Sequence, residues 1–145
     1  MNPINKTVHD FKHFIQWLFG KDVQKSMPGN GRGFRRKTSK FWEIWPMQPK
    51  IESPMNVIYV DGIYLGRKAC ILICCNERYV LGWYLCRYEN SRAWEALMQR
   101  IAAPAMVVSD GGHGFRKALK RVWPKAKLQR CTFHAFIPVS YTHLR

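Results

Sequence analysis

Two short apolar runs in this chain each end in Asp followed by Gly, and these carboxylates are the residues best suited to chemistry. The first run is 57–60 before Asp61, and the second is 106–109 before Asp110. β-Branched residues bounded by glycine predict buried strands, so each carboxylate is expected where a strand stops. Two neighbouring carboxylates on rigid elements suit a divalent cation such as Mg²⁺. The alternative is that Asp-Gly only turns the chain; because two occur at matching strand ends, we favour the metal site.

The elements around these residues predict one sheet with helices packed on it. Three strands joined by short turns are expected to pair antiparallel, and a helix, a strand, a helix and a strand follow. The expected ranges are 57–60, 69–75, 79–86, 105–109 and 127–131 for the strands, and 91–101 and 115–123 for the helices. This order predicts an α/β fold with a mixed sheet. A right-handed crossover through the first helix would place Asp61 and Asp110 on neighbouring strands, about 5 Å apart.

The charge of the chain favours a polyanionic partner. Lysine and arginine number 24 against 9 aspartates and glutamates in 145 residues, giving a formal net charge of +15. Such an excess attracts nucleic acid, whereas membrane-surface binding would need the cations on one face of a long amphipathic helix. We expect no signal peptide and no membrane anchor. Five cysteines in mostly apolar sequence favour reduced thiols in a cytoplasmic protein.

The first 54 residues differ in composition from the rest. Apolar residues at helical spacing between 7 and 19 predict an amphipathic helix that Gly20 ends. The segment 21–54, with its Gly, Pro and cations, predicts a linker and a basic arm. Four cations flanked by aromatic residues are candidates for DNA binding: Arg35, Arg36, Lys37 and Lys40. A solvated charge run whose aromatic residues fill the core is an equally weighted alternative.

Cys131 and His134 have the spacing of metal ligands. A tetrahedral zinc site needs a second pair, and the sequence contains no Cys-x-x-Cys and no His-x-x-His. It also lacks a Gly-x-Ser-x-Gly motif, and a Cys-His pair three residues apart does not by itself give an activated thiolate. A structural zinc site and nucleophilic hydrolase chemistry are therefore disfavoured.

Several motifs in combination resemble those of a known family. They are VDGIYLG at 60–66, VLGWY at 80–84, ENSRAW at 89–94, VVSDGG at 107–112 and QRCTFH at 129–134. Between about Phe34 and Phe136 the chain resembles prokaryotic Mutator-type insertion-sequence transposases. The resemblance implies an RNase H-like fold and DNA cleavage and strand transfer by an Asp-Asp-Glu triad with two Mg²⁺ (or Mn²⁺) ions.

The resemblance also implies roles for individual residues. Asp61 resembles the first catalytic Asp and Asp110 the second, and Cys131 with His134 resembles the family's Cys-x-x-His signature. The implied partners are transposon-end and target DNA, with self-association of the intact parent. The implied location is the bacterial cytoplasm, at the nucleoid when DNA is bound.

The chain departs from the family pattern at both ends. The family's catalytic Glu lies far downstream, and no acidic residue follows Asp110 here. We expect a helical segment at 1–20, an arm at 21–54, a partial RNase H-like domain at 55–137 that is incomplete at its C-terminus, and a non-native tail at 138–145. The expected function is that of a transposase fragment, inactive alone. The alternatives are a non-catalytic basic nucleic-acid-binding module and an RNase H-like nuclease.

Overall fold

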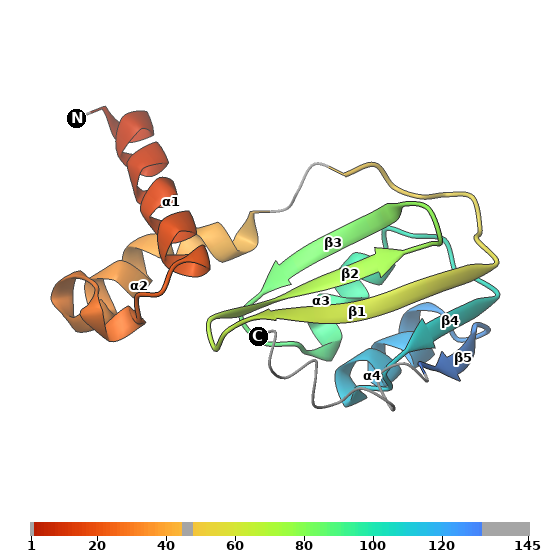
Figure 1. Ribbon diagram of the computed structural model, residues 1–145. Helices are drawn as coiled ribbons and strands as arrows, with labels where there is room; N and C mark the ends of the chain where they lie inside the picture. The colour runs from red at the N-terminus through yellow and green to blue at the C-terminus, as the bar shows by residue number, and fades with distance from the viewer. Residues whose placement is uncertain (1, 45–47, 132–145) are drawn as a thin grey trace. The chain divides into compact units, whose positions relative to one another are not determined.

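Five strands form one mixed sheet that carries the candidate site (Figure 1). The structure is a computed structural model that describes residues 2–44 and 48–131. The chain divides into two units, Met1–Trp45 and Pro46–Arg145, and the sheet belongs to the second. Its strands are β1 (Val57–Leu65), β2 (Ala69–Cys75), β3 (Val80–Cys86), β4 (Met106–Ser109) and β5 (Lys127–Arg130).

The strand order is β3-β2-β1-β4-β5. β1 pairs with β2 and β2 with β3 antiparallel, which confirms the predicted three-strand meander. β1 pairs with β4 and β4 with β5 in parallel. The helical connection after β3 therefore returns the chain beside β1, as the crossover argument predicted. An α/β fold with a mixed sheet is confirmed.

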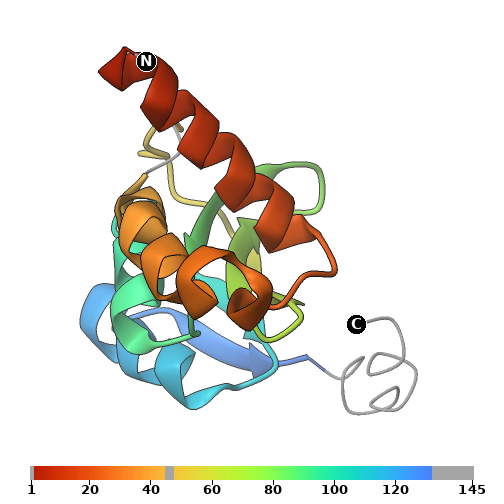
Figure 2. The same ribbon diagram turned by 90° about the vertical axis from the view of Figure 1, so that its left-hand side faces the viewer.

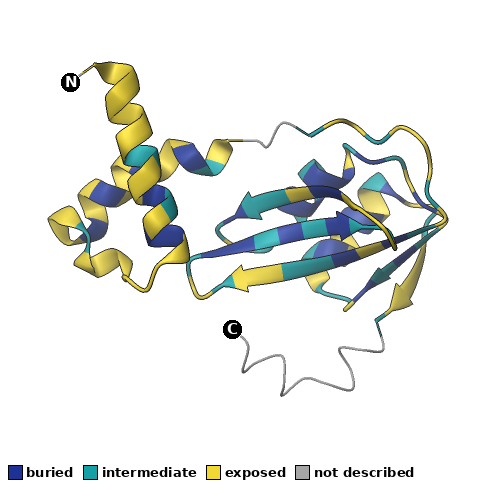
Figure 3. Cartoon of the chain, turned by 45° about the horizontal axis from the view of Figure 1, so that its top comes forward, coloured by how far each residue is buried: buried dark blue, intermediate teal, exposed yellow. Residues whose placement is uncertain are grey.

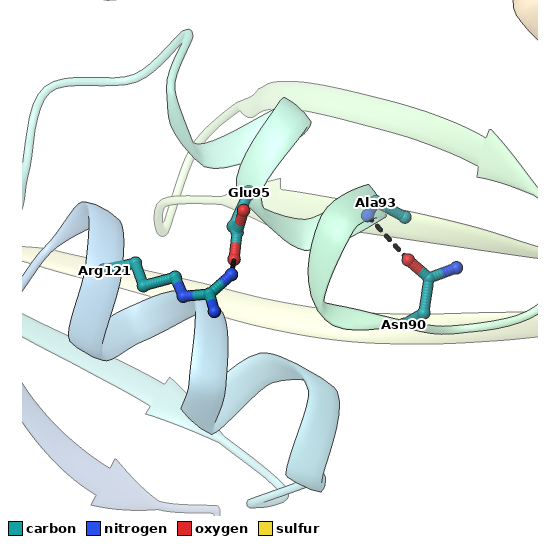
Figure 4. A network of polar contacts seen from close by, with 4 residues as sticks. All are labelled: Asn90, Ala93, Glu95 and Arg121. Atoms are coloured by element: carbon teal, nitrogen blue, oxygen red, sulfur yellow. Dashed lines mark hydrogen bonds and ion pairs between the residues drawn. The ribbon is translucent and has the colours of Figure 1, made fainter.

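Two helices, α3 (Ser91–Met98) and α4 (His113–Val122), share one core with the sheet. Ile58 and Val60 of β1 are buried in that core because alternate residues of a strand face the same side. The Trp94 and Phe115 rings join the helices at a centroid distance of 5.1 Å. Figure 4 shows two polar contacts nearby: the side-chain oxygen of Asn90 accepts the Ala93 N–H at the start of α3, and Glu95 pairs with Arg121.

The opposite face of the sheet is apolar and partly open to solvent. Tyr59 and Ile63 of β1 are each 42% exposed, and Trp83 of β3 is 39% exposed. Figure 3 shows this alternation of buried and exposed residues along the strands. Asp61 belongs to this open face because it alternates with Tyr59 and Ile63 along β1, and alternate residues of a strand face the same side of the sheet.

The N-terminal unit is helical. It contains α1 (Pro3–Phe19), α2 (Arg32–Thr38) and the 3₁₀ segments η1 (Gln24–Ser26), η2 (Pro28–Gly31) and η3 (Ser39–Glu43), which Figure 2 shows from a second side. The predicted helix is confirmed and starts earlier than expected, because the Asn2 side chain caps it. Gly20 follows its last residue. None of the helices in the described ranges is long and apolar enough to cross a membrane.

The segment expected to be a linker and arm contains helical turns over most of 24–43. Phe34 and Phe41 are buried with Phe14 of α1, and the Phe14 and Phe41 ring centroids lie 5.5 Å apart. The division of the chain thus falls at Trp45, inside the segment 21–54, because these aromatic side chains join α2 and η3 to α1. Trp45 itself and the tail at 138–145 lie outside the described residues.

Candidate active site

Asp61 lies on β1, and Asp110 directly follows β4, the neighbouring parallel strand. The β1–β4 ladder pairs Val57 with Met106 and continues to Tyr59 opposite Val108. Carried two residues further, this register brings Asp61 and Asp110 to corresponding positions. The prediction that the first and fourth strands are neighbours is therefore confirmed.

The prediction that Asp61 ends its strand is wrong. β1 continues to Leu65, and its ladder with β2 runs from Tyr59 opposite Cys75 to Leu65 opposite Ala69. The turn that the sequence suggested at Asp61-Gly62 comes instead after Leu65, where Gly66 has a φ of 57°. Asp61 marks a different boundary: it lies just past the last residue of β1 that pairs with β4.

Each aspartate accepts a backbone hydrogen bond from a following glycine. The Gly62 N–H donates to Asp61 Oδ1 at 2.9 Å, and the Gly112 N–H donates to Asp110 Oδ1 at 3.2 Å. Asp110 thus has the local turn contact of the alternative interpretation, and it also ends a strand beside Asp61. A role in the turn and a role in cation binding are compatible because a carboxylate has two oxygens.

A hollow of about 320 Å³ lies beside Asp61 on the open face of the sheet. Its other lining residues are Tyr59, Val60, Ile63, Ile73, Cys75, Val108 and Cys131. Cys131 reaches it because its N–H donates to the Ser109 carbonyl at 2.7 Å, which extends the β4–β5 ladder. Burial, followed by the nearby charge of Asp61, raises the pKa of the Cys75 thiol, so this thiol stays protonated at neutral pH. His134 lies outside the described residues.

Two charged residues at this site were not predicted from the sequence. Glu89, in the connection between β3 and α3, accepts hydrogen bonds from Tyr64 and Trp94. Arg116 of α4 is exposed, and its Nη2 would lie 3.0 Å from a methyl group added to Gly111, next to Asp110. No spacing rule links either residue to the aspartates: Glu89 lies on the connection that crosses back to β4, and Arg116 lies on α4, which follows Asp110 in the chain.

The donor set suits a hard divalent cation in type. Carboxylate oxygens are the ligands that Mg²⁺ and Mn²⁺ prefer. Within 2–44 and 48–131, however, no group of three or more His, Cys, Asp or Glu side chains is placed to hold a metal ion. Asp61 and Asp110 are thus two donors of the right type, and the described residues place no third donor with them.

The four candidate DNA-binding cations lie in the N-terminal unit. Arg35, Arg36 and Lys37 are exposed on α2, and Lys40 is exposed on η3 with its Nζ 5.3 Å from the Phe41 ring centroid. Phe34 and Phe41 are only 8% and 4% exposed. These two rings fill the core, as the alternative interpretation held, and are not available to stack on bases.

Comparison with known proteins identifies the family. A model of the Mutator family of transposases matches residues 69–142, slightly more than half of the chain. This chain belongs to the Mutator family of transposases. Asp110, Cys131 and His134 fall inside the matched range, whereas Asp61 precedes it.

Two transposases of bacterial insertion sequences are among the relatives. The chain is 31% identical over 145 aligned positions to the transposase of insertion sequence element IS905 from Lactococcus lactis subsp. lactis (strain IL1403), covering 88% of this chain and 36% of that protein. It is 30% identical over 95 positions to the transposase of IS6120 from Mycolicibacterium smegmatis, covering 53% and 28%. The chain thus spans about a third of the length of these curated relatives.

Proposed function

We propose that residues 55–137 form the front part of an RNase H-like catalytic domain of a transposase that cuts and joins DNA. Membership of the Mutator family supports this proposal. The mixed sheet, with its antiparallel meander and its parallel β1–β4 pair, is compatible with that fold. The intact parent would bind transposon ends and target DNA in the bacterial cytoplasm and would self-associate.

The observation that carries the proposal is the parallel pairing of β1 with β4, whose register, continued two residues past Tyr59 and Val108, would set Asp61 opposite Asp110. In the proposed site these two carboxylates bind Mg²⁺ or Mn²⁺, and a Glu outside this chain completes the triad. A bound ion of this kind supplies charge stabilisation to the oxygens of a phosphodiester during in-line displacement. The role of the chain's own residues is to hold two carboxylates in fixed register on one sheet.

The exposed cations of α2 and η3 support DNA binding by the N-terminal unit. Arg35, Arg36, Lys37 and Lys40 lie within six consecutive residues and are all exposed. Cations so placed neutralise phosphates without reading sequence. The same observation favours the second candidate function, a nucleic-acid-binding module without chemistry.

A Mg²⁺ titration of DNA binding distinguishes the two functions. Fluorescence anisotropy of a labelled duplex is followed with the full chain at fixed ionic strength as Mg²⁺ replaces monovalent salt. The proposed function predicts a Mg²⁺ response in the wild-type chain that Asp61→Ala or Asp110→Ala removes, with no cleavage of the duplex. An identical response in all three proteins would favour the module without chemistry.

A further inference from the structure

The carboxylate of Glu89 is held in place from two elements. The Tyr64 hydroxyl of β1 donates to Oε2 at 2.5 Å, and the Trp94 indole N–H of α3 donates to Oε1 at 3.0 Å. Trp94 is itself 1% exposed and packed against Phe115. The two donors fix both oxygens, so the carboxylate has a defined position rather than a solvated one.

Two glycines make room for this carboxylate, one beside each aspartate. A methyl group added to Gly62 would lie 3.2 Å from Glu89 Oε2, and one added to Gly112 would lie 3.4 Å from Glu89 Oε1. The second methyl group would also lie 3.7 Å from Asp110 Oδ1. One carboxylate therefore lies close to both segments that carry the aspartates.

The same two glycines hold the aspartates. The Gly62 N–H binds Asp61 Oδ1, and the Gly112 N–H binds Asp110 Oδ1. Each glycine is thus close to Glu89 and also donates a hydrogen bond to its own aspartate. We infer that Glu89 is a positioning residue that sets the spacing of Asp61 and Asp110, a role that rests on the metal site proposed above.

Glu89 acts in this scheme through the backbone. Among the described residues it does not join Asp61 and Asp110 in a group placed to hold one ion. Its side chain is partly buried, and its two oxygens are occupied by Tyr64 and Trp94. Groups that orient metal ligands from outside the coordination sphere typically alter metal affinity by about 10- to 100-fold when removed.

The test is a Mn²⁺ titration of the full chain, with free Mn²⁺ measured by electron paramagnetic resonance. Glu89→Ala is expected to weaken Mn²⁺ binding by about 10-fold. Tyr64→Phe keeps the shape of the ring and removes one hydrogen bond, so it is expected to weaken binding by a smaller factor. The melting temperature of each metal-free variant is measured in parallel, because a purely structural residue would change that temperature and leave the Mn²⁺ affinity of the folded chain unchanged.

Glu95→Gln is the matched control. Glu95 lies one turn into α3 and pairs with Arg121 at 3.0 Å (Figure 4), so the variant removes one negative charge from the same helical region without touching either glycine. Wild-type Mn²⁺ affinity is expected for Glu95→Gln, and Asp61→Asn is expected to lose Mn²⁺ binding.

The outcomes separate the positioning role from the proposed metal site. If Asp61→Asn loses binding while Glu89→Ala and Tyr64→Phe bind as the wild type does, the positioning role is overturned and the metal site stands. If the wild type does not bind Mn²⁺, the proposed site and the positioning role both fail. If Glu89→Ala does not fold, the Mn²⁺ affinity of Tyr64→Phe decides whether the positioning role holds.

Discussion

At the scale of single residues, the site is built from two Asp-Gly units that share one neighbour. Asp61 and Asp110 each accept an N–H from a following glycine, and the carboxylate of Glu89 lies near both glycines. Glycine at position 62 is explained by the close approach of Glu89 and Cys70, whereas a methyl group at position 112 would meet Glu89 at an ordinary contact distance. Neither has the positive φ that would require glycine on backbone grounds alone.

The two glycines are predicted to differ in their tolerance of a methyl group. In Gly62→Ala the methyl group would meet Cys70 Sγ and Glu89 Oε2, both at 3.2 Å, whereas in Gly112→Ala the nearest atom is 3.4 Å away. We expect Gly62→Ala to destabilise the sheet unit by about 1–3 kcal/mol, as overpacking of a filled site does. Hydrogen exchange of the slowest β2 amides in the full chain measures the change. Gly112→Ala is the control; an equal or larger loss there would contradict the explanation.

The sequence predicted Asp61 and Asp110 because an acidic residue after an apolar run is a local pattern. Glu89 and Arg116 belong to no such pattern: Glu89 is held near both Asp-Gly segments by Tyr64 and Trp94, and Arg116 comes near Gly111 through the turn into α4. The aromatic residues beside Arg35 could not be assigned to core or surface from composition, because the rings of Phe34 and Phe41 pack against aromatic residues of α1, which lie far away in sequence.

At the scale of secondary-structure elements, the parallel pairing of β1 with β4 organises the site. β1 is longer than β4: it stays paired with β2 as far as Leu65, whereas β4 ends at Ser109. Asp61 consequently lies beside the end of β4, where Asp110 begins the turn into α4. Helix α3, which connects β3 to β4, packs in the same core as buried residues of β1 and β4 and so supports this pairing.

The start of α3 is predicted to depend on its cap. The Asn90 side-chain oxygen accepts the Ala93 N–H at 2.9 Å, and the helix it caps spans only Ser91–Met98. Asn90→Ala is expected to destabilise the sheet unit by about 1 kcal/mol, and Asn90→Ser, which restores a capping oxygen, to recover most of that loss. Exchange of the same β2 amides measures both changes. Equal losses in the two variants would show that capping is not the cause.

Strand and helix positions in the second unit were largely predictable, because alternation and helical spacing are strong there. The end of β1 was not, since Asp-Gly is typical of a turn and the pairing of Ile63 and Leu65 with β2 is a tertiary effect. The helical turns over 24–43 were missed for a similar reason. Pro28 and three glycines between 29 and 33 are typical of a linker, yet η2 and α2 contain them.

At the scale of the whole molecule, two units carry different parts of the proposed function. The exposed cations Arg35, Arg36, Lys37 and Lys40 belong to the N-terminal unit, and the aspartates belong to the sheet unit. The chain belongs to the Mutator family of transposases, and the proposed function gives both features a common purpose, DNA strand transfer. The chain spans about a third of its curated relatives, so that purpose is proposed for the intact parent.

Binding of DNA by this chain is predicted to depend strongly on salt. The logarithm of the association constant should fall linearly with the logarithm of the salt concentration, with a slope of about 0.9 per phosphate contact. Replacing Arg35, Arg36, Lys37 and Lys40 by Gln should reduce that slope. Replacing four other exposed cations of the same unit, Lys6, Lys12, Lys21 and Lys25, removes the same charge and serves as the control. Equal reductions in both variants would argue against a specific DNA-binding role for α2 and η3.

The most direct test of the central claim, that Asp61 and Asp110 form one metal site, is a double-mutant cycle on Mn²⁺ affinity. The wild-type chain, Asp61→Asn, Asp110→Asn and the double variant are titrated with Mn²⁺ under identical conditions. If the two carboxylates share an ion, each single variant loses most of the binding and the double variant loses little more, because their effects are coupled. Independent, additive losses, or wild-type affinity in either single variant, would contradict the account.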